Sequence, residues 1–328
     1  QADLVAEDAN LSRVKAEGWL TLESAETVFR MGGLGYDSLK RAAASRAFVP
    51  VPLGVTASLR IENRIQRSTS RNVLARLPGR ERPEEVVVYM AHWDHLGIDP
   101  SLEGDSIYNG AHDNASGTAA LIELGEAFSS LDEAPERSIL LLAVTAEEDG
   151  LLGSKHYAAD PVYPLENTVG AINLDAMKNL WGPTRDVTVV GHGMSELEQV
   201  LATAAEAQGR RLRPDSEPEK GFFYRSDHFE FAKRGVPALY MEGGIDYVEG
   251  GEEYGHRMRR EWTEQRYHKP ADEFDESWNL EGAIQDLRLL FRVGYRLANG
   301  EMWPEWYEGT EFRATREAMM ADGASGTE

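Results

Sequence analysis

Residues 86–117, VVVYMAHWDHLGIDPSLEGDSIYNGAHDNASG, decide the fold class and the place where chemistry is expected. The stretch begins with a continuous apolar run over 86–91, which predicts a strand buried on both faces. The run ends on His92-Trp93-Asp94, and after a long loop the acidic turn Gly110–Asn114 opens a helix. A histidine at a strand end with a carboxylate two residues later suits a metal site, because the carboxylate can hold the ring nitrogen that does not bind the metal.

The rest of the chain alternates between apolar runs of strand length and helical periods. Further strands are predicted at residues 72–77, 139–144, 169–174, 187–190 and 238–241. Helices are predicted at residues 116–131, 151–159, 195–208 and 279–299, with Ser195 as an N-cap. Strands that alternate with helices predict an α/β fold with a mixed, mostly parallel central sheet and helices on both faces.

The segments outside this alternation predict a small appendage at each end. Residues 1–48 contain two helical pieces separated by the glycines of 32–35 and are expected to form a helical arm or cap. Residues 49–300 would form the catalytic domain and residues 301–328 a C-terminal tail. Residues 51–66 alternate apolar and polar side chains, which predicts an edge or antiparallel strand. Residues 243–266 lack a period and predict a long loop over the site.

Composition excludes several classes of function. The 328 residues carry a net charge of -22, which argues against a nucleic-acid partner, because phosphate binding needs clustered Lys and Arg. No apolar run is long enough to span a membrane, and the first residues, QADLVAEDANLSR, contain no signal segment. There is no cysteine, so a metal must be held by His, Asp and Glu. The sequence carries no signal of oligomeric state.

More polar clusters follow the predicted strands. Glu147 and Glu148 follow the strand at 139–144, Asp175 follows the next one, and the cluster 267–272, YHKPAD, lies beyond the long loop. The carboxyl ends of the strands of an open α/β sheet line a common crevice, so two histidines and several carboxylates should converge there. Such a set suits two divalent ions bridged by one carboxylate, and zinc is the expected metal.

These motifs together resemble the co-catalytic two-zinc aminopeptidases, a group that also contains glutaminyl cyclases and glutamate carboxypeptidase II-like enzymes. The similarity covers roughly residues 70–298 and implies a three-layer sandwich of the zinc exopeptidase type. The resemblance implies two zinc ions, one held by His92, Asp113 and Asp175, the other by Asp113, Glu148 and His268, with Asp113 bridging.

The resemblance also implies roles for residues that do not bind metal. Glu147 would be the general base, Asp94 would orient His92, and Tyr267 would donate a hydrogen bond to the developing oxyanion. Arg225 and Asp227 would line the substrate cleft. His112 departs from the family, because relatives often carry a small or apolar residue beside the bridging aspartate. The other histidines, at 95, 156, 192, 228 and 256, are expected to be packing or surface groups.

The expected function is zinc-dependent removal of N-terminal residues from peptides by a metal-bridged hydroxide. The expected substrates have a free N-terminus, because carboxylates outnumber bases in the ligand motifs. The alternatives are a glutaminyl cyclase-like or carboxypeptidase-like member of the same fold, and a receptor-like relative without catalysis. The resemblance implies a periplasmic or secreted protein.

Overall fold

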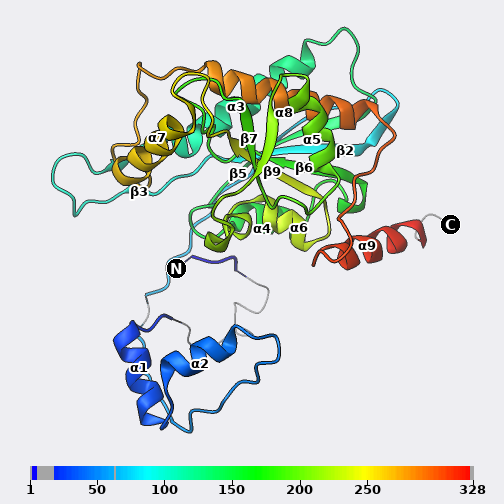
Figure 1. Ribbon diagram of the computed structural model, residues 1–328. Helices are drawn as coiled ribbons and strands as arrows, with labels where there is room; N and C mark the ends of the chain where they lie inside the picture. Colours follow the sequence, from blue (N-terminus) through cyan, green and yellow to red (C-terminus); the bar gives the residue numbers. More distant parts are fainter. Residues whose placement is uncertain (1, 6–17, 63, 326–328) are drawn as a thin grey trace. The chain divides into compact units, whose positions relative to one another are not determined.

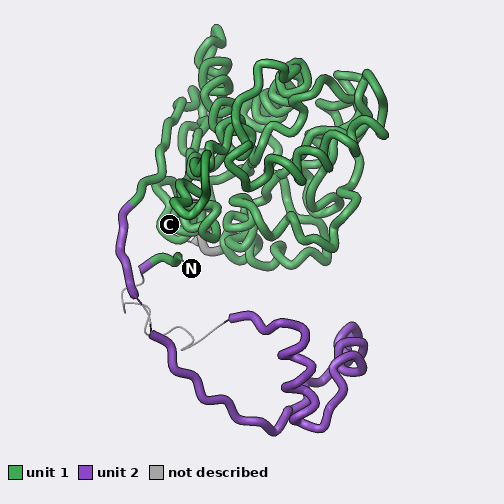
Figure 2. The backbone as a smooth tube through the Cα atoms, turned by 90° about the vertical axis from the view of Figure 1, so that its left-hand side faces the viewer, with its two compact units in different colours: residues 1–4, 70–328 green, residues 5–69 purple. Residues whose placement is uncertain are grey.

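A computed structural model of the protein describes residues 2–5, 18–62 and 64–325 (Figure 1). The chain forms two compact units, one of residues 1–4 and 70–328 and the other of residues 5–69 (Figure 2). This division lies at residue 69, whereas the sequence analysis placed the end of the arm at residue 48. Residues 6–17 of the predicted arm and 326–328 of the predicted tail lie outside the described residues.

The larger unit is built on a mixed sheet. Its strands are β1 (Val73–Leu77), β2 (Arg82–His92), β5 (Arg137–Val144), β6 (Thr168–Asn173), β7 (Asp186–Val190), β8 (Arg211–Pro214) and β9 (Ala238–Gly243). Among the described residues these strands pair in the order β1-β5-β2-β6-β9-β7-β8. β5, β2, β6 and β9 are parallel neighbours, while β1 pairs antiparallel with β5 and β7 antiparallel with β9. The predicted mixed, mostly parallel sheet is confirmed.

Helices cover both faces of the sheet. The α-helices of this unit are α3 (Ser116–Ser129), α4 (Leu152–Ala159), α5 (Leu197–Glu206), α6 (His228–Lys233), α7 (Gly251–Gln265), α8 (Glu281–Asn299) and α9 (Arg313–Ser325). α3, α5 and α8 pack on one face and α4 and α6 on the other (Figure 1). A short hairpin of β3 (Gly97–Ile98) and β4 (Ile107–Tyr108) lies in the loop between β2 and α3.

The central strand β2 shows why both faces are covered. Successive side chains of a strand point to opposite faces, and every residue from Val86 to Ala91 is fully buried. Val87 and Tyr89 belong to the core beneath α3 and α8, whereas Val88 and Met90 belong to the core beneath α4 and α6. Each such side chain stabilises the fold by about 1.5–3 kcal/mol through burial, so the continuous apolar run fixes β2 at the centre of the sheet.

The predicted strand over residues 51–66 is wrong. Residues 51–62 and 64–66 form neither helix nor strand. The apolar side chains of the alternation are exposed instead, with Leu59 75% and Ile61 55% accessible. Period-two alternation makes a strand only where a neighbouring strand satisfies its backbone, and no described strand pairs with this segment.

Two expectations about helices also fail. The segment 243–266 was expected to be a loop, but it contains α7. Among the described residues of this helix only Gly255 is buried, so its sequence is polar and shows little apolar periodicity. A partly buried ion pair anchors this helix, because Arg259 Nη1 lies 3.0 Å from Glu242 Oε2 near the end of β9. Ser195 is not an N-cap, since α5 begins at Leu197 and the backbone of Ser195 forms a bridge with Trp306.

The smaller unit contains the two predicted arm helices, α1 (Leu22–Met31) and α2 (Tyr36–Ala43). The Thr21 side chain caps α1 by accepting a hydrogen bond from the Ser24 backbone. The rings of Phe29 and Tyr36 meet edge to face with centroids 5.3 Å apart, which joins the two helices. Neither helix buries a residue. No described helix is long and apolar enough to cross a membrane.

Candidate metal centre

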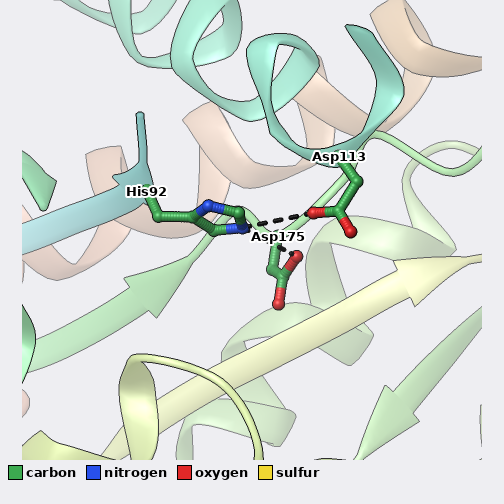
Figure 3. A group of neighbouring side chains, drawn as sticks. All are labelled: His92, Asp113 and Asp175. Atoms are coloured by element: carbon green, nitrogen blue, oxygen red, sulfur yellow. Dashed lines mark ion pairs between the residues drawn. The ribbon is translucent and has the colours of Figure 1, made fainter. Parts of the chain in front are cut away.

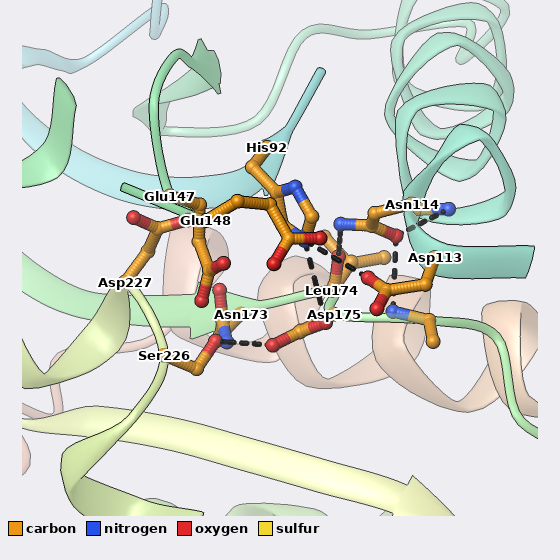
Figure 4. A network of polar contacts seen from close by, with 12 residues as sticks. His92, Asp113, Asn114, Glu147, Glu148, Asn173, Leu174, Asp175, Ser226 and Asp227 are labelled. Carbon is orange, nitrogen blue, oxygen red and sulfur yellow. Dashed lines mark hydrogen bonds and ion pairs between the residues drawn. The ribbon is translucent and has the colours of Figure 1, made fainter. Parts of the chain in front are cut away.

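The predicted site residues converge at one edge of the sheet. His92 is the last residue of β2, Glu147 and Glu148 follow β5, and Asp175 follows β6. These three strands are adjacent and parallel, so their carboxyl ends lie side by side (Figure 4). Asp113 reaches the same place from the turn before α3.

His92, Asp113 and Asp175 form the first metal-binding group (Figure 3). His92 Nε2 lies 3.3 Å from Asp113 Oδ1 and 3.5 Å from Asp175 Oδ1. The candidate ligand atoms all lie within 4.8 Å of one another. One imidazole and two carboxylates around so small a space suit zinc, which binds nitrogen and oxygen ligands at about 2.0–2.2 Å.

A second group forms around the other oxygen of Asp113. His268 Nε2 lies 3.3 Å from Asp113 Oδ2 and 3.2 Å from Glu148 Oε2. Asp113 therefore presents one carboxylate oxygen to each group, which is the arrangement that a bridging ligand requires. The structure brings together all five residues predicted to bind metal.

Charge within the site favours ionised aspartate beside protonated histidine until a cation replaces the protons. The pKa of Asp113 is held well below its usual value, because hydrogen bonds from His268 and His92 outweigh its burial. Hydrogen bonds to Asp113 and Glu148 raise the pKa of His268 to about 9. The pKa of His92 also rises well above its usual value, although burial opposes the rise.

The bridging aspartate is held by the loop that carries His268. The Asp272 carboxylate is fully buried and accepts hydrogen bonds from the backbone N–H groups of His112, at 3.1 Å, and Asp113, at 3.0 Å. The next residue, Asn114, is fixed by its own side chain, which donates a hydrogen bond to the Leu174 carbonyl (Figure 4). The peptide bond between Asp113 and Asn114 is cis. The ligand position is thus defined by contacts from distant parts of the chain.

Asp94 contacts the site differently from the prediction. Its carboxylate lies 3.9 Å from His92 Nδ1, beyond hydrogen-bonding distance, and the Asp94 main-chain oxygen is nearer at 3.2 Å. The carboxylate instead accepts hydrogen bonds from the backbone N–H groups of Glu147 and Glu148, at 3.2 and 3.3 Å. Asp94 therefore holds the turn that presents both glutamates.

Glu147 has the environment of a group whose proton affinity is raised. Burial, together with Asp175 and Asp227 nearby, raises the pKa of Glu147 to about 10. Asp227 lies beside Glu147 (Figure 4), is fully buried and accepts a hydrogen bond of 2.6 Å from the Ser154 hydroxyl. Of the two residues predicted to line the substrate cleft, Asp227 is fully buried and Arg225 is exposed.

The backbone is strained at three points of the site. Ala146, Ala176 and His268 have φ values of 54°, 60° and 54°, a region that side chains other than glycine seldom occupy. Each of these residues is a site residue or directly precedes or follows one. Such conformations cost about 1–3 kcal/mol and persist where surrounding contacts enforce them, as they often do at functional sites.

Tyr267 is held by stacking. Its ring lies 3.9 Å from that of His268 and 5.2 Å from that of Trp262, measured between centroids. Burial and the neighbouring carboxylates raise the pKa of Tyr267 well above its usual value, so its hydroxyl keeps its proton. The tyrosine can therefore donate a hydrogen bond at neutral pH.

His112 is an aromatic packing residue. Its buried ring lies among Trp262, Trp181 and Trp278, at 4.5, 6.0 and 6.2 Å between centroids. Burial lowers the pKa of His112 to about 3, so it is neutral. His112, the residue beside Asp113 that departs from the family, is thus accommodated by a cluster of tryptophans.

Sequence reasoning missed three residues of the site. Asp272 holds Asp113, and the Ser226 hydroxyl donates a 2.6 Å hydrogen bond to Asp175. His95 was expected to be a packing or surface group, but its Nδ1 lies 2.7 Å from Glu148 Oε1. The only signal in the sequence was that each of the three lies within four residues of a predicted ligand or in a motif already noted.

Comparisons with known proteins agree with this geometry. The chain is 34% identical over 132 residues to an aminopeptidase NAALADL1 of Mus musculus, covering 38% of this chain and 16% of that protein. It is 33% identical over 135 residues to a probable zinc metalloprotease of Pyrenophora tritici-repentis, covering 39% of this chain and 27% of that protein. The chain thus spans less than a third of the length of these relatives.

A solved structure, the zinc aminopeptidase BSAP of Bacillus subtilis, has a similar fold, with a TM-score of 0.52 and 23% identity. The similarity covers 74% of this chain and 52% of that one. Residues 72–291, which hold the whole sheet and every ligand discussed above, match the family described as Peptidase family M28. Since this match extends over more than half of the chain, the protein belongs to peptidase family M28.

Proposed function

We propose that the protein is a zinc-dependent aminopeptidase that binds two zinc ions and removes N-terminal residues from peptides. The observation that carries the proposal is that the two carboxylate oxygens of Asp113 face different histidines. Oδ1 lies 3.3 Å from His92 Nε2, and Oδ2 lies 3.3 Å from His268 Nε2. Two histidine–carboxylate groups that share one carboxylate suit two ions. A site for a single ion would not require the second group. The names of the relatives from Mus musculus and Pyrenophora support a zinc peptidase.

His92, Asp113 and Asp175 would hold one ion, and Asp113, Glu148 and His268 the other. Bound zinc would polarise the scissile carbonyl and lower the pKa of a water molecule. Positive charge brought to the site would also lower the raised pKa of Glu147, because it favours the ionised carboxylate.

Glu147 would act as the general base. It belongs to neither candidate ligand group, yet it lies near His92 and Asp175 of the first group and Glu148 of the second (Figure 4). Glu147 would take a proton from the attacking water and pass it to the leaving amine. Tyr267, which keeps its proton, would donate a hydrogen bond to the oxygen on which charge develops.

The same carboxylates would select the end of the peptide. A free α-ammonium group at the site gains charge-assisted hydrogen bonds, with Glu147 and Asp175 as the acceptors, and a free carboxylate there is repelled. Unblocked aminoacyl amides and peptides should therefore be substrates.

A comparison of free and N-acetylated forms of the same aminoacyl substrates tests the proposal. The free forms should be cleaved at least ~100-fold faster in kcat/KM, which corresponds to about 2.7 kcal/mol. Equal turnover of both forms would refute aminopeptidase action. Release of C-terminal residues from blocked peptides would instead indicate a carboxypeptidase.

A further inference from the structure

His95 lies against the second metal-binding group. It follows β2 by three residues, and its side chain is 7% exposed. His95 Nδ1 lies 2.7 Å from Glu148 Oε1, while the other oxygen, Oε2, lies 3.2 Å from His268 Nε2. The two oxygens of Glu148 are therefore divided between His95 on one side and the metal-binding group on the other.

The His95 ring packs closely against Gly110, where a side chain would clash with it. Gly110 has a φ of 60°, and a Cβ at that position would lie 2.7 Å from the ring carbon Cγ of His95. Any other residue at position 110 would push the imidazole away. The ring also meets that of His268 edge to face, with centroids 5.8 Å apart, and lies 6.4 Å from the ring of Tyr108.

The contact with Glu148 determines which nitrogen of the His95 ring carries the hydrogen. An ionised carboxylate only accepts hydrogen bonds, so the imidazole must carry its hydrogen on Nδ1. Nε2 has no hydrogen-bond partner among the described residues, so the bond to Glu148 is the only one that orients this ring.

We infer that His95 is a positioning residue for the second metal ion. Its Nδ1–H donates to Glu148 Oε1, which turns Oε2 toward the ion and holds the carboxylate in one orientation. This inference rests on the proposed function and deepens it, because it assigns a partner to a ligand. Hydrogen-bond partners of metal ligands typically change metal affinity by about 10- to 100-fold.

The geometry favours positioning over direct ligation by His95. The candidate ligand atoms of His95, Asp113 and Glu148 do lie within 4.8 Å of one another. His268 Nε2, however, lies within 3.3 Å of both Asp113 and Glu148, whereas His95 Nδ1 forms a hydrogen bond with Glu148.

Zinc titration of the apoprotein, with competing chelators, tests the inference without relying on activity. His95→Leu removes the donor, and His95→Asn keeps an N–H close to the position of Nδ1. His156→Leu, on the exposed surface of α4, is the matched control. Thermal unfolding of each variant would verify that it is folded.

His95→Leu should weaken the second zinc by about 10- to 100-fold while the first changes less than about 3-fold. His95→Asn should restore most of that affinity, and His156→Leu should match the wild type. Wild-type affinities in His95→Leu would overturn the inference. Loss of the second zinc in His95→Asn and His95→Leu alike would also overturn it, since His95 would then be a ligand. Failure of the wild type to bind two ions would contradict the proposed function itself.

Discussion

Glu147 and Glu148 are adjacent in sequence but differ in their surroundings. Glu148 contacts His95 and His268, whereas the neighbours that affect the pKa of Glu147 are chiefly Asp175 and Asp227. Asp94 holds the backbone N–H groups of both, so the turn directs the two side chains to different places. The proposed division of roles, with Glu148 as a ligand and Glu147 as the base, therefore rests on the surroundings of single residues.

Replacing each glutamate by glutamine should separate these roles. Glu147→Gln keeps the shape but cannot accept a proton, so kcat should fall by ~100-fold or more with zinc content unchanged. Glu148→Gln should weaken zinc binding, because it removes a charged ligand. Metal analysis and steady-state kinetics on both variants provide the measurement, and equal loss of metal in the two would show that the assignment is wrong.

Tyr267 is predicted to act on the transition state. Tyr267→Phe removes the hydroxyl and retains the ring, which stacks on that of His268 and lies tilted against that of Trp262. We expect kcat to fall about 10- to 100-fold with little change in KM, since the hydrogen bond strengthens only as charge develops. Kinetics of the variant with zinc content measured alongside would test this, and a rise in KM at constant kcat would point to ground-state binding instead.

At the scale of elements, two loops distant in sequence are tied together at the metal centre. The turn at 111–115 carries Asp113, and the loop after α7 carries His268 and Asp272. The Asp272 carboxylate accepts hydrogen bonds from the backbone N–H groups of His112 and Asp113, so the second loop fixes the backbone of Asp113, the proposed bridging ligand, in the first. Both metal groups depend on this junction.

Asp272→Asn should disturb that junction. An amide has one acceptor oxygen and places an N–H₂ group beside a backbone donor, so at least one buried hydrogen bond is lost. We expect the free energy of unfolding to fall by about 1–3 kcal/mol and zinc to bind more weakly at both positions. Denaturant unfolding and zinc titration would measure this.

Asp275→Asn is the control for that variant, because Asp275 lies in the same loop and accepts hydrogen bonds from Ser277 and Arg266 rather than from the backbone of Asp113. If Asp272→Asn bound zinc as well as this control, the junction would have no part in holding Asp113.

At the scale of the whole molecule, the sheet unit contains every residue assigned to the site. The smaller unit, residues 5–69, contains the helices α1 and α2, which bury no residues. The metal centre and the core beneath it are thus built entirely within residues 70–328.

A chain that lacks residues 1–69 should therefore bind two zinc ions and retain kcat/KM within about 3-fold. The deletion removes the ion pair of Lys155 with Asp3, and exposed pairs of this kind contribute only about 0–1 kcal/mol. Zinc analysis and kinetics of the shortened protein provide the test, with Asp3→Asn in the full chain as the control. A shortened protein that folds but cannot bind zinc would show that the smaller unit supports the site.

The sequence by itself determined the centre of the fold and the convergence of the polar site residues. The apolar run at 86–91 could only be a strand buried on both faces, and the polar residues after β2, β5 and β6 had to meet because parallel strands end at one edge. Local composition is a sufficient signal in such cases, since burial and strand direction leave few alternatives.

Only the tertiary structure decided the contacts between distant segments. Alternation over 51–66 predicted a strand that has no partner, and the polar sequence of 251–265 gave no sign of α7, which an ion pair to Glu242 anchors. In the same way, His95 differs from a surface histidine because Glu148 reaches it from the segment after β5. Pairing and ion-pair partners depend on where the chain returns in space, and no local pattern contains that information.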